Sequence, residues 1–186
     1  KFSGEALTPR AHATYSAAKW DKVGWNGPAA LQQPEMFRGA NKVTLDAKGR
    51  MAMPARYRDT LVERSEGRLV ATVDRADRCL LVYPLPDWEE IERKLMRLPT
   101  LNPQARRLQR LMVGHATDLE LDSHGRVLVP PKLREYAGLS RQAMLIGQGS
   151  RFELWDEQHW NERRDEWLQA GDEPGALPAE LEQLSL

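Results

Sequence analysis

One stretch of this sequence occurs twice. LDAKGRMAMPARYR, at residues 45–58, returns 76 residues later as LDSHGRVLVPPKLR, at residues 121–134. Leucine, aspartate, glycine, arginine, proline and a final arginine stand at identical internal positions in the two copies. A chain of 186 residues has room for one well-cored domain or for two small ones that share a core. The duplication predicts two related units that fold in the same way.

The first copy predicts a strand, a tight turn, a second strand and a short helix. Apolar residues alternate with polar or small neighbours, which is typical of strands with one buried face. These apolar residues are Val43, Leu45, Met51 and Met53. Between them, "DAKG" places Asp46 and Gly49 at the first and fourth positions of a type I turn, where an aspartate accepts backbone N–H bonds and a glycine tolerates a left-handed conformation. Pro54 then fits the first position of a helix.

The rest of each unit follows the same order. In the first unit, Tyr57, Leu61 and Val62 have helical spacing, and "RLVATVD" and "CLLVYP" indicate two further strands. The second unit repeats this order with the "DSHG" turn, a proline-started helix that stops at Gly138, and the strands "AMLIGQ" and "RFELWD". The sequence thus predicts an α+β fold built from two β-α-β units.

Helices that carry tryptophan follow both strand pairs. At the first of them, Asp87 and Glu90 have the spacing of a capping box. Between the units, Asn102 and Pro103 open another helix. The spacing of four tryptophans favours packing in the core or between subunits over stacking on bases. They are Trp88, Trp155, Trp160 and Trp167.

Charge is balanced overall but not along the chain. The 27 basic and 27 acidic residues give no global attraction to nucleic acid or membranes, so an electrostatic partner must meet a local patch. Residues 36–60 hold six basic side chains against two acidic ones, whereas residues 153–186 hold ten acidic side chains against two arginines. The basic segment is a candidate footprint for phosphate. Its basic residues are Arg38, Lys42, Lys48, Arg50, Arg56 and Arg58.

Enzymatic and metal chemistry find little support. The four histidines are scattered, and the chain has no phosphate loop, nucleophile elbow or zinc-helix motif. We therefore expect no catalytic residue, no metal site and no cofactor. Cys79, the one cysteine, cannot form an internal disulfide, and its apolar surroundings predict a buried strand residue. No apolar stretch approaches the roughly 20 residues of a membrane span, so we expect a cytoplasmic protein.

The repeated Asp-x-x-x-Arg element leaves two interpretations open. Across each turn, Asp46 can reach Arg50 and Asp122 can reach Arg126. A guanidinium oriented in this way suits phosphate oxygens or the edge of guanine. A purely structural pair is equally ordinary, because exposed ion pairs contribute only about 0–1 kcal/mol.

Neighbouring charges separate the two copies. Lys48 on the first turn favours the binding interpretation there. The second turn has His124 at that position, which carries no fixed positive charge at neutral pH. Residues 118–135 also hold four acidic side chains against three basic ones. We expect the first copy to make most of the charge-driven contacts.

Several motifs together resemble the bacterial MraZ proteins, which contain two SpoVT/AbrB-like DNA-binding units in tandem. The motifs are, in order, MFRGANKVTLDAKGRMAMPARYR, CLLVYPLPDWEEIERKL, RRLQRLMVGHA, LDSHGRVLVPPKLREYAGL and FELWDEQHW. The resemblance covers residues 36–186. It implies an intrachain swapped-hairpin β-barrel with flanking helices, and a homo-oligomer in which the chains form a ring.

The resemblance also implies the organisation of the chain. We expect AbrB-like units at residues 40–87 and 116–159, a helical connection at 88–115, and a C-terminal helix with an acidic tail at 160–186. Residues 1–35 are expected to be a disordered leader or a non-native extension before a native start at Met36. An N-terminal arm that orders on a partner is the alternative.

The implied function is sequence-specific binding of double-stranded DNA. MraZ proteins are regulators at repeated promoter sites of the division and cell-wall gene cluster, including their own gene, and associate with the nucleoid. A repressor of this kind is our leading hypothesis. The DNA-binding residues expected from the motif and the basic segment are Arg50, Lys48, Arg38, Lys42 and Arg126. The residues expected to orient the turns are Asp46, Gly49, Asp122 and Gly125. The competing hypothesis is a protein-interaction scaffold that uses the tryptophan helices and the acidic tail.

Overall fold

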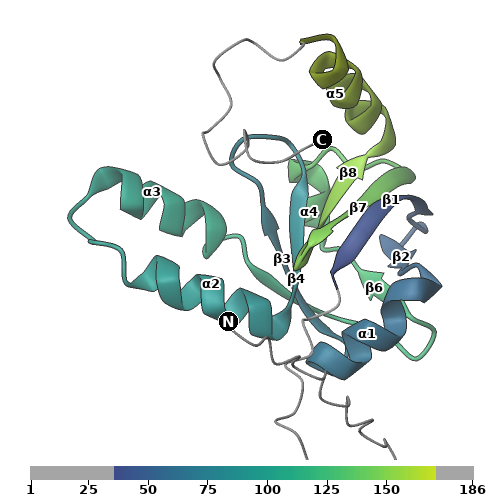
Figure 1. Ribbon diagram of the computed structural model, residues 1–186, viewed down its shortest axis with the longest axis horizontal. Coiled ribbons are helices and arrows are strands. Elements are labelled where there is room, and N and C mark those ends of the chain that lie inside the picture. The colour runs from purple at the N-terminus through teal and green to yellow at the C-terminus, as the bar shows by residue number, and fades with distance from the viewer. Residues whose placement is uncertain (1–35, 171–186) are drawn as a thin grey trace, which may run out of the picture. The chain divides into compact units, whose positions relative to one another are not determined.

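A computed structural model describes residues 36–170 of the chain (Figure 1). The strands are β1 (Phe37–Thr44), β2 (Arg50–Ala52), β3 (Arg68–Val73), β4 (Leu80–Pro84), β5 (Thr117–Glu120), β6 (Arg126–Leu128), β7 (Gln142–Gly149) and β8 (Arg151–Asp156). The helices are α1 (Ala55–Ser65), α2 (Leu85–Met96), α3 (Pro103–Met112), α4 (Pro131–Tyr136) and α5 (Glu157–Ala170). The expected α+β class is confirmed. The leader at residues 1–35 and the acidic tail at residues 171–186 lie outside the described residues.

The two units exchange strands. We call β1 to β4 with α1 the first unit, and β5 to β8 with α4 the second. In the described residues, one antiparallel sheet has the order β1-β7-β8-β4-β3-β5, and a separate two-stranded ladder joins β2 to β6. The first strand of each unit therefore pairs with a strand of the other unit, β1 with β7 and β5 with β3. Equivalent strands occur in the same order from either edge of the sheet, which gives the chain an internal two-fold arrangement.

The sheet stays open in the described part of the chain. Its edges are β1 and β5, and the β2–β6 ladder belongs to a different sheet, so the strands do not form one continuous closed barrel there. The ladder instead covers one face of the six-stranded sheet through its buried side chains. The fold shown is an α+β arrangement of antiparallel sheets.

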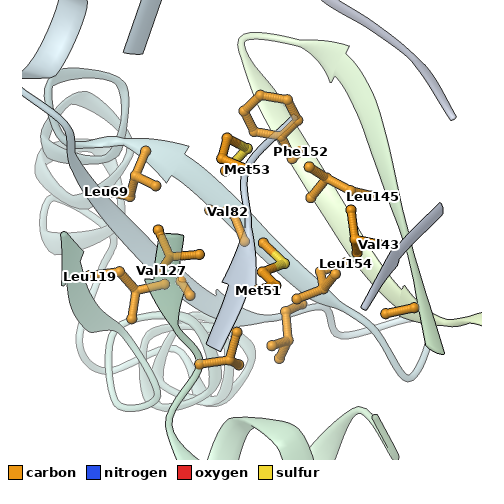
Figure 2. Close-up of a cluster of buried hydrophobic side chains, with 14 of the residues drawn as sticks. Val43, Met51, Met53, Leu69, Val82, Leu119, Val127, Leu145, Phe152 and Leu154 are labelled. Atoms are coloured by element: carbon orange, nitrogen blue, oxygen red, sulfur yellow. The ribbon is translucent and has the colours of Figure 1, made fainter. Parts of the chain in front are cut away.

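A single core lies between the ladder and the sheet (Figure 2). Met51 and Val127 are register partners in the ladder, and both side chains are buried. Figure 2 shows them beside Val82 and Leu154 of the sheet. Because both units contribute strands to this core, neither can bury its apolar face alone.

Helices cover the other face of the sheet (Figure 1). α2 and α3 pack on β3 and β4, with Trp88 buried among Val70, Leu81 and Tyr83. α5 packs on β7 and β8, where Trp155 is buried. Strands β3 and β4 are covered on both faces, and this explains their nearly unbroken runs of buried residues.

Most local expectations are confirmed, and the first helix differs in two details. The four alternating residues Val43, Leu45, Met51 and Met53 are all buried. Tyr57 and Leu61 of α1 are buried as well, but Val62 is 55% exposed because it lies next to Leu61 on the adjacent, solvent-facing side of the helix. Pro54 is the residue before α1 rather than its first residue.

The expected capping box at α2 is wrong. The helix begins at Leu85, directly after Pro84, and it has no side-chain cap. Asp87 therefore lies inside the first turn, where it accepts a hydrogen bond from Arg64 at 2.7 Å. Glu90 pairs with Lys94 at 2.7 Å instead of closing a capping box.

Two other helix signals are confirmed. Asn102 caps α3, since its side chain accepts from the backbone N–H groups of Gln104 and Ala105. Gly138 follows α4 with a φ of 60°, which a glycine adopts without steric cost.

Cys79 is buried, as expected, although it lies one residue before β4. Burial away from water raises the pKa of its thiol strongly, so the side chain is an unreactive core group. Within residues 36–170, no helix combines the length and the apolar composition of a membrane span.

Candidate nucleic-acid interface

The first turn, residues 46–49, has the geometry that its sequence predicts. The backbone N–H of Gly49 donates to the Asp46 carbonyl at 2.9 Å, and Gly49 has a φ of 83°. The Asp46 side chain accepts backbone N–H bonds from Lys48 and Arg50, both at 2.9 Å. Its other oxygen accepts from the Arg50 guanidinium at 2.8 Å and 2.7 Å. One carboxylate thus fixes both the turn and the arginine.

The second turn, residues 122–125, repeats this geometry. Gly125 donates to the Asp122 carbonyl at 2.8 Å and has a φ of 68°. Asp122 accepts backbone bonds from His124 at 2.8 Å and Arg126 at 2.9 Å, and it holds the Arg126 guanidinium at 2.8 Å and 2.7 Å. The expectation that each aspartate reaches the arginine four residues later is confirmed in both copies.

Both aspartates stay ionised well below neutral pH. The backbone N–H of Arg50 is the first cause that lowers the pKa of Asp46, with further help from its guanidinium and from the Lys48 N–H. The Arg126 guanidinium, followed by its backbone N–H, lowers the pKa of Asp122 to about 2. Hydrogen bonds to the charged form cause these shifts, so both aspartates are ionised at physiological pH. We call each aspartate, together with the arginine that it holds, a clamp.

The two clamped arginines share one outward face of the β2–β6 ladder. Arg50 lies opposite Leu128, and Arg126 lies opposite Ala52. The residues between them, Met51 and Val127, point into the core, so these four positions face outward. Each arginine side chain is 33% exposed. Each guanidinium engages its aspartate through only part of its fork of donors, which leaves further N–H groups for a ligand.

Each turn also contacts an arginine of the other unit. A Cβ placed on Gly49 would lie 2.6 Å from Nε of Arg134, and one on Gly125 would lie 2.6 Å from Nε of Arg58. No motif in the sequence signals this exchange directly, because Arg58 is 12 residues from the first residue of the first turn yet lies at the second turn. Only the matching final arginines of the two copies pointed to a shared role.

The surroundings of the two turns differ in charge. The residue before the first turn, Leu45, donates its N–H to the carbonyl of Arg141, whereas Leu121 donates to the carbonyl of Gly67. A hollow beside the first turn is lined by residues that include Asp46, Arg134 and Arg141. The first turn therefore has an extra arginine beside it, and its exposed Lys48 corresponds to His124 in the second.

The structure separates the remaining residues of the basic segment. Lys42 pairs with Glu157 of α5 at 2.7 Å, and Arg38 lies at the start of β1, the end away from the first turn. Arg56 donates to the Arg38 carbonyl, to Asn41 and to the Tyr57 hydroxyl. The single cluster implied by sequence proximity does not form, because β1 is extended and α1 leads away from the turn. Lys48 and Arg50 are the members that lie together at the first turn.

The tryptophans are mainly packing residues. Trp88 and Trp155 are 3% and 1% exposed, and Trp160 is half-buried against Trp155. Trp167 near the end of α5 is 45% exposed, and Leu168 beside it is 76% exposed. Packing is confirmed for the buried rings, and the end of α5 presents a small apolar surface.

No group of three or more histidine, cysteine, aspartate or glutamate side chains in residues 36–170 is arranged to hold a metal ion. The clustered groups at the two turns are arginines and their partner carboxylates. Positively charged hydrogen-bond donors of this kind are chemically suited to anions.

Comparison with known proteins gives consistent matches. The family model described as "MraZ protein, putative antitoxin-like" matches residues 36–111 and again residues 112–173. The protein named transcriptional regulator MraZ of Halorhodospira halophila is 59% identical over 152 residues, which cover 81% of this chain and 100% of that protein. The equally named protein of Thioalkalivibrio sulfidiphilus is 62% identical over 151 residues, and that of Pseudomonas aeruginosa 59% over 151 residues, with the same coverage of each chain.

Proposed function

The chain belongs to the MraZ family, and from this premise we propose that it is a sequence-specific DNA-binding transcriptional regulator. MraZ proteins are transcriptional regulators, not enzymes. The more specific proposal is a repressor that acts on repeated promoter sites of the division and cell-wall gene cluster, including its own gene. Such a protein works in the cytoplasm, in association with the nucleoid.

The outward face of the β2–β6 ladder carries this proposal. Arg50 and Arg126 lie on that face, and each is held by an ionised aspartate of its own turn. A guanidinium group that is fixed in position and permanently charged is suited to phosphate oxygens and to the O6 and N7 atoms of guanine. In this role Lys48 supplies a flexible charge for the DNA backbone, and Gly49 and Gly125 let the turns close tightly.

Arg38 and Lys42 have supporting roles in the proposal. Both lie on the exposed side of β1, away from the turn, and Lys42 is already paired with Glu157. We assign them contacts with flanking phosphates, weaker than those of Lys48 and Arg50, because an existing ion pair must exchange partners before Lys42 can bind.

The proposed assembly is a swapped-hairpin barrel within each chain and a ring of several chains. The pairing of β1 with β7 and β5 with β3 supports the exchange of hairpins between AbrB-like units at residues 40–87 and 116–159, joined by the helical connection at 88–115. A ring would present many turns to repeated DNA sites. Linked weak sites rebind at high effective concentration, so such a ring binds tightly although each turn makes few contacts.

Substitution of the first turn tests the proposal. Arg50→Ala and Lys48→Ala should each weaken binding of promoter-repeat DNA. Arg50→Ala should nearly abolish binding, because water cannot replace the fixed guanidinium group. Binding is measured by gel shift at two salt concentrations, and the oligomer is checked by size-exclusion chromatography. Arg164→Ala on α5 is the matched control, since it removes the same charge from an exposed arginine paired with Asp165. Parent-like affinity in both first-turn variants would overturn the assignment.

A scaffold that binds another protein is the second candidate. The exposed Trp167 and Leu168 at the end of α5 favour it, because adjoining exposed apolar side chains are typical of interaction surfaces. Its other element, the acidic tail, lies outside the described residues. The gel-shift titration separates the two candidates, since a scaffold without DNA affinity would give no salt-dependent shift.

A further inference from the structure

We propose that each DNA-binding turn is a composite site, completed by an arginine of the opposite unit. Arg134 would supply a phosphate contact at the first turn, and Arg58 would do so at the second. This inference rests on the proposed DNA-binding function and adds two contact residues to it. Neither arginine belongs to the Asp-x-x-x-Arg element.

The contact between Arg134 and the first turn is close and is fixed by the backbone. Arg134 Nε donates to the carbonyl of Val129 at 3.1 Å, and the N–H of the same Val129 donates to the carbonyl of Gly49 at 2.9 Å. The side chain thus lies against Gly49, where a Cβ would approach its Nε to 2.6 Å and its Cζ to 2.7 Å. The absence of a side chain at Gly49 makes room for this arginine.

The opposite contact has the same design. Arg58 Nε donates to the carbonyl of Met53 at 2.7 Å, and the Met53 N–H donates to the carbonyl of Gly125 at 2.9 Å. A Cβ on Gly125 would lie 2.6 Å from Arg58 Nε. Both copies keep this arrangement although most neighbouring positions differ between them, which argues against a chance contact.

The ends of these guanidinium groups are available to a ligand. Among residues 36–170, the Arg134 and Arg58 side chains have no hydrogen-bond acceptor other than the carbonyl that holds Nε. Both residues are half-buried, and their terminal nitrogens are not among the buried polar atoms without a partner in the described part of the chain, so the stems are held while the terminal N–H groups reach the surface. A charged donor group in this state, beside a turn that carries another basic residue, is suited to a phosphate.

The two composite sites are unequal. At the first turn, Arg134 lies against Gly49, the residue after Lys48, and Arg141 lines a hollow together with Arg134. At the second turn, Arg58 lies against Gly125, the residue after His124, and Gly67 stands at the position that corresponds to Arg141. The first site therefore gathers more positive charge, part of which comes from the second unit.

Arg134→Met tests the inference, because methionine keeps an apolar stem against Gly49 and removes the charge. In the folded oligomer, we expect affinity for promoter-repeat DNA to fall about tenfold, as for loss of a charged hydrogen bond. The slope of log K against log salt should become shallower by about one phosphate contact. Arg58→Met is the matched control at the weaker site and should have a smaller effect on both quantities. Arg134→Lys should keep the slope.

A double-mutant cycle adds a readout that a purely structural arginine would not move. Lys48→Ala and Arg134→Met should be coupled at low salt and become nearly additive at high salt, where screening removes their joint attraction for DNA. Unchanged affinity and slope in a folded Arg134→Met variant would overturn the composite site while Arg50→Ala still supports the proposed function. Absence of DNA binding by the parent protein would overturn both proposals. Should Arg134→Met not fold, Arg134→Lys and Arg134→Gln provide the same comparison of charge, and equal slopes in those two would count against the contact.

Discussion

The two turns have nearly the same internal geometry and different surroundings. In both, the aspartate holds its arginine at 2.8 Å and 2.7 Å, and both arginine side chains are 33% exposed. Yet Lys48 in the first turn corresponds to His124 in the second, and Arg141 beside the first corresponds to Gly67. The same aspartate, glycine and arginine build the clamp in both turns, whereas the charge around it depends on one variable turn residue and on neighbours from the other unit.

This difference shows how a duplicated unit can specialise. The clamp needs only an aspartate, a glycine and an arginine at fixed spacing, so it survives in both copies. Charge nearby can change without disturbing the turn, because those side chains are exposed and take no part in its hydrogen bonds. One copy can therefore become the stronger anion site while both keep the same fold.

The largest expected effect is a loss of stability in the core, to which each copy contributes one partner of the pair Met51 and Val127. Met51→Ala should lower the free energy of unfolding by about 2–5 kcal/mol, because it leaves a cavity in a fully buried site. Val127→Ala, at the register partner, removes fewer atoms and should cost less, about 1–3 kcal/mol. Urea unfolding followed by tryptophan fluorescence and by circular dichroism measures both values.

The two probes should give one coincident transition in both variants, since strands of both units pack in one core. Separate transitions for the two units would contradict the strand exchange as the source of stability. Val62→Ala is a suitable control, because that side chain is exposed and its loss should change stability little.

A smaller effect should follow from making the second turn resemble the first. His124→Lys adds a fixed charge at the position that matches Lys48, so DNA affinity at low salt should rise by roughly a fewfold and the salt slope should steepen by about one contact. The reciprocal change, Lys48→His, should do the opposite. Fluorescence anisotropy titrations over a series of salt concentrations measure both variants. If His124→Lys left the slope unchanged, the second turn would not lie against phosphate.

The smallest expected effect is the dependence of the clamps on pH. Asp122 has a pKa lowered to about 2 in the folded chain, against about 3.9 in an unfolded one. Its stabilising contribution is therefore fully present above about pH 4 and is lost as the pH falls through the folded value near 2. Asp122→Asn should destabilise the protein at pH 7, and the difference from the parent should shrink between about pH 4 and pH 2.

Asp46→Asn should also destabilise the protein at pH 7, and its difference from the parent should also shrink on acidification, since the pKa of Asp46 is lowered too. Urea midpoints of parent and variants at successive pH values provide the measurement. A gap between parent and Asp122→Asn that widened on acidification would mean that the aspartate is not held as an ionised clamp.

Much of the local structure could be predicted from the sequence. The turn residues, the alternation around Met51 and the Asn102 cap act within a few residues, so short-range hydrogen bonding and side-chain period decide them. The capping box at Asp87 could not be judged in this way. Its outcome depended on Pro84 and on the distant partner Arg64, which competes for the same carboxylate.

The candidate site was predictable only in part. The Asp-x-x-x-Arg clamps and the position of Lys48 follow from the motif. The grouping of Arg38, Lys42 and Arg56 with them did not, because residues close in sequence diverge along an extended strand and a helix. The DNA contacts of all these residues stay a prediction.

The sequence by itself determined the repeated unit: its strands, its two clamped turns and the face of each strand that is buried. These features depend on backbone preferences and on the spacing of residues within one copy. Only the tertiary structure decided that Arg134 lies against the first turn and Arg58 against the second. The exchange of strands between units brings residues more than 80 apart into contact, as for Gly49 and Arg134, and no short-range rule can assign such a pair.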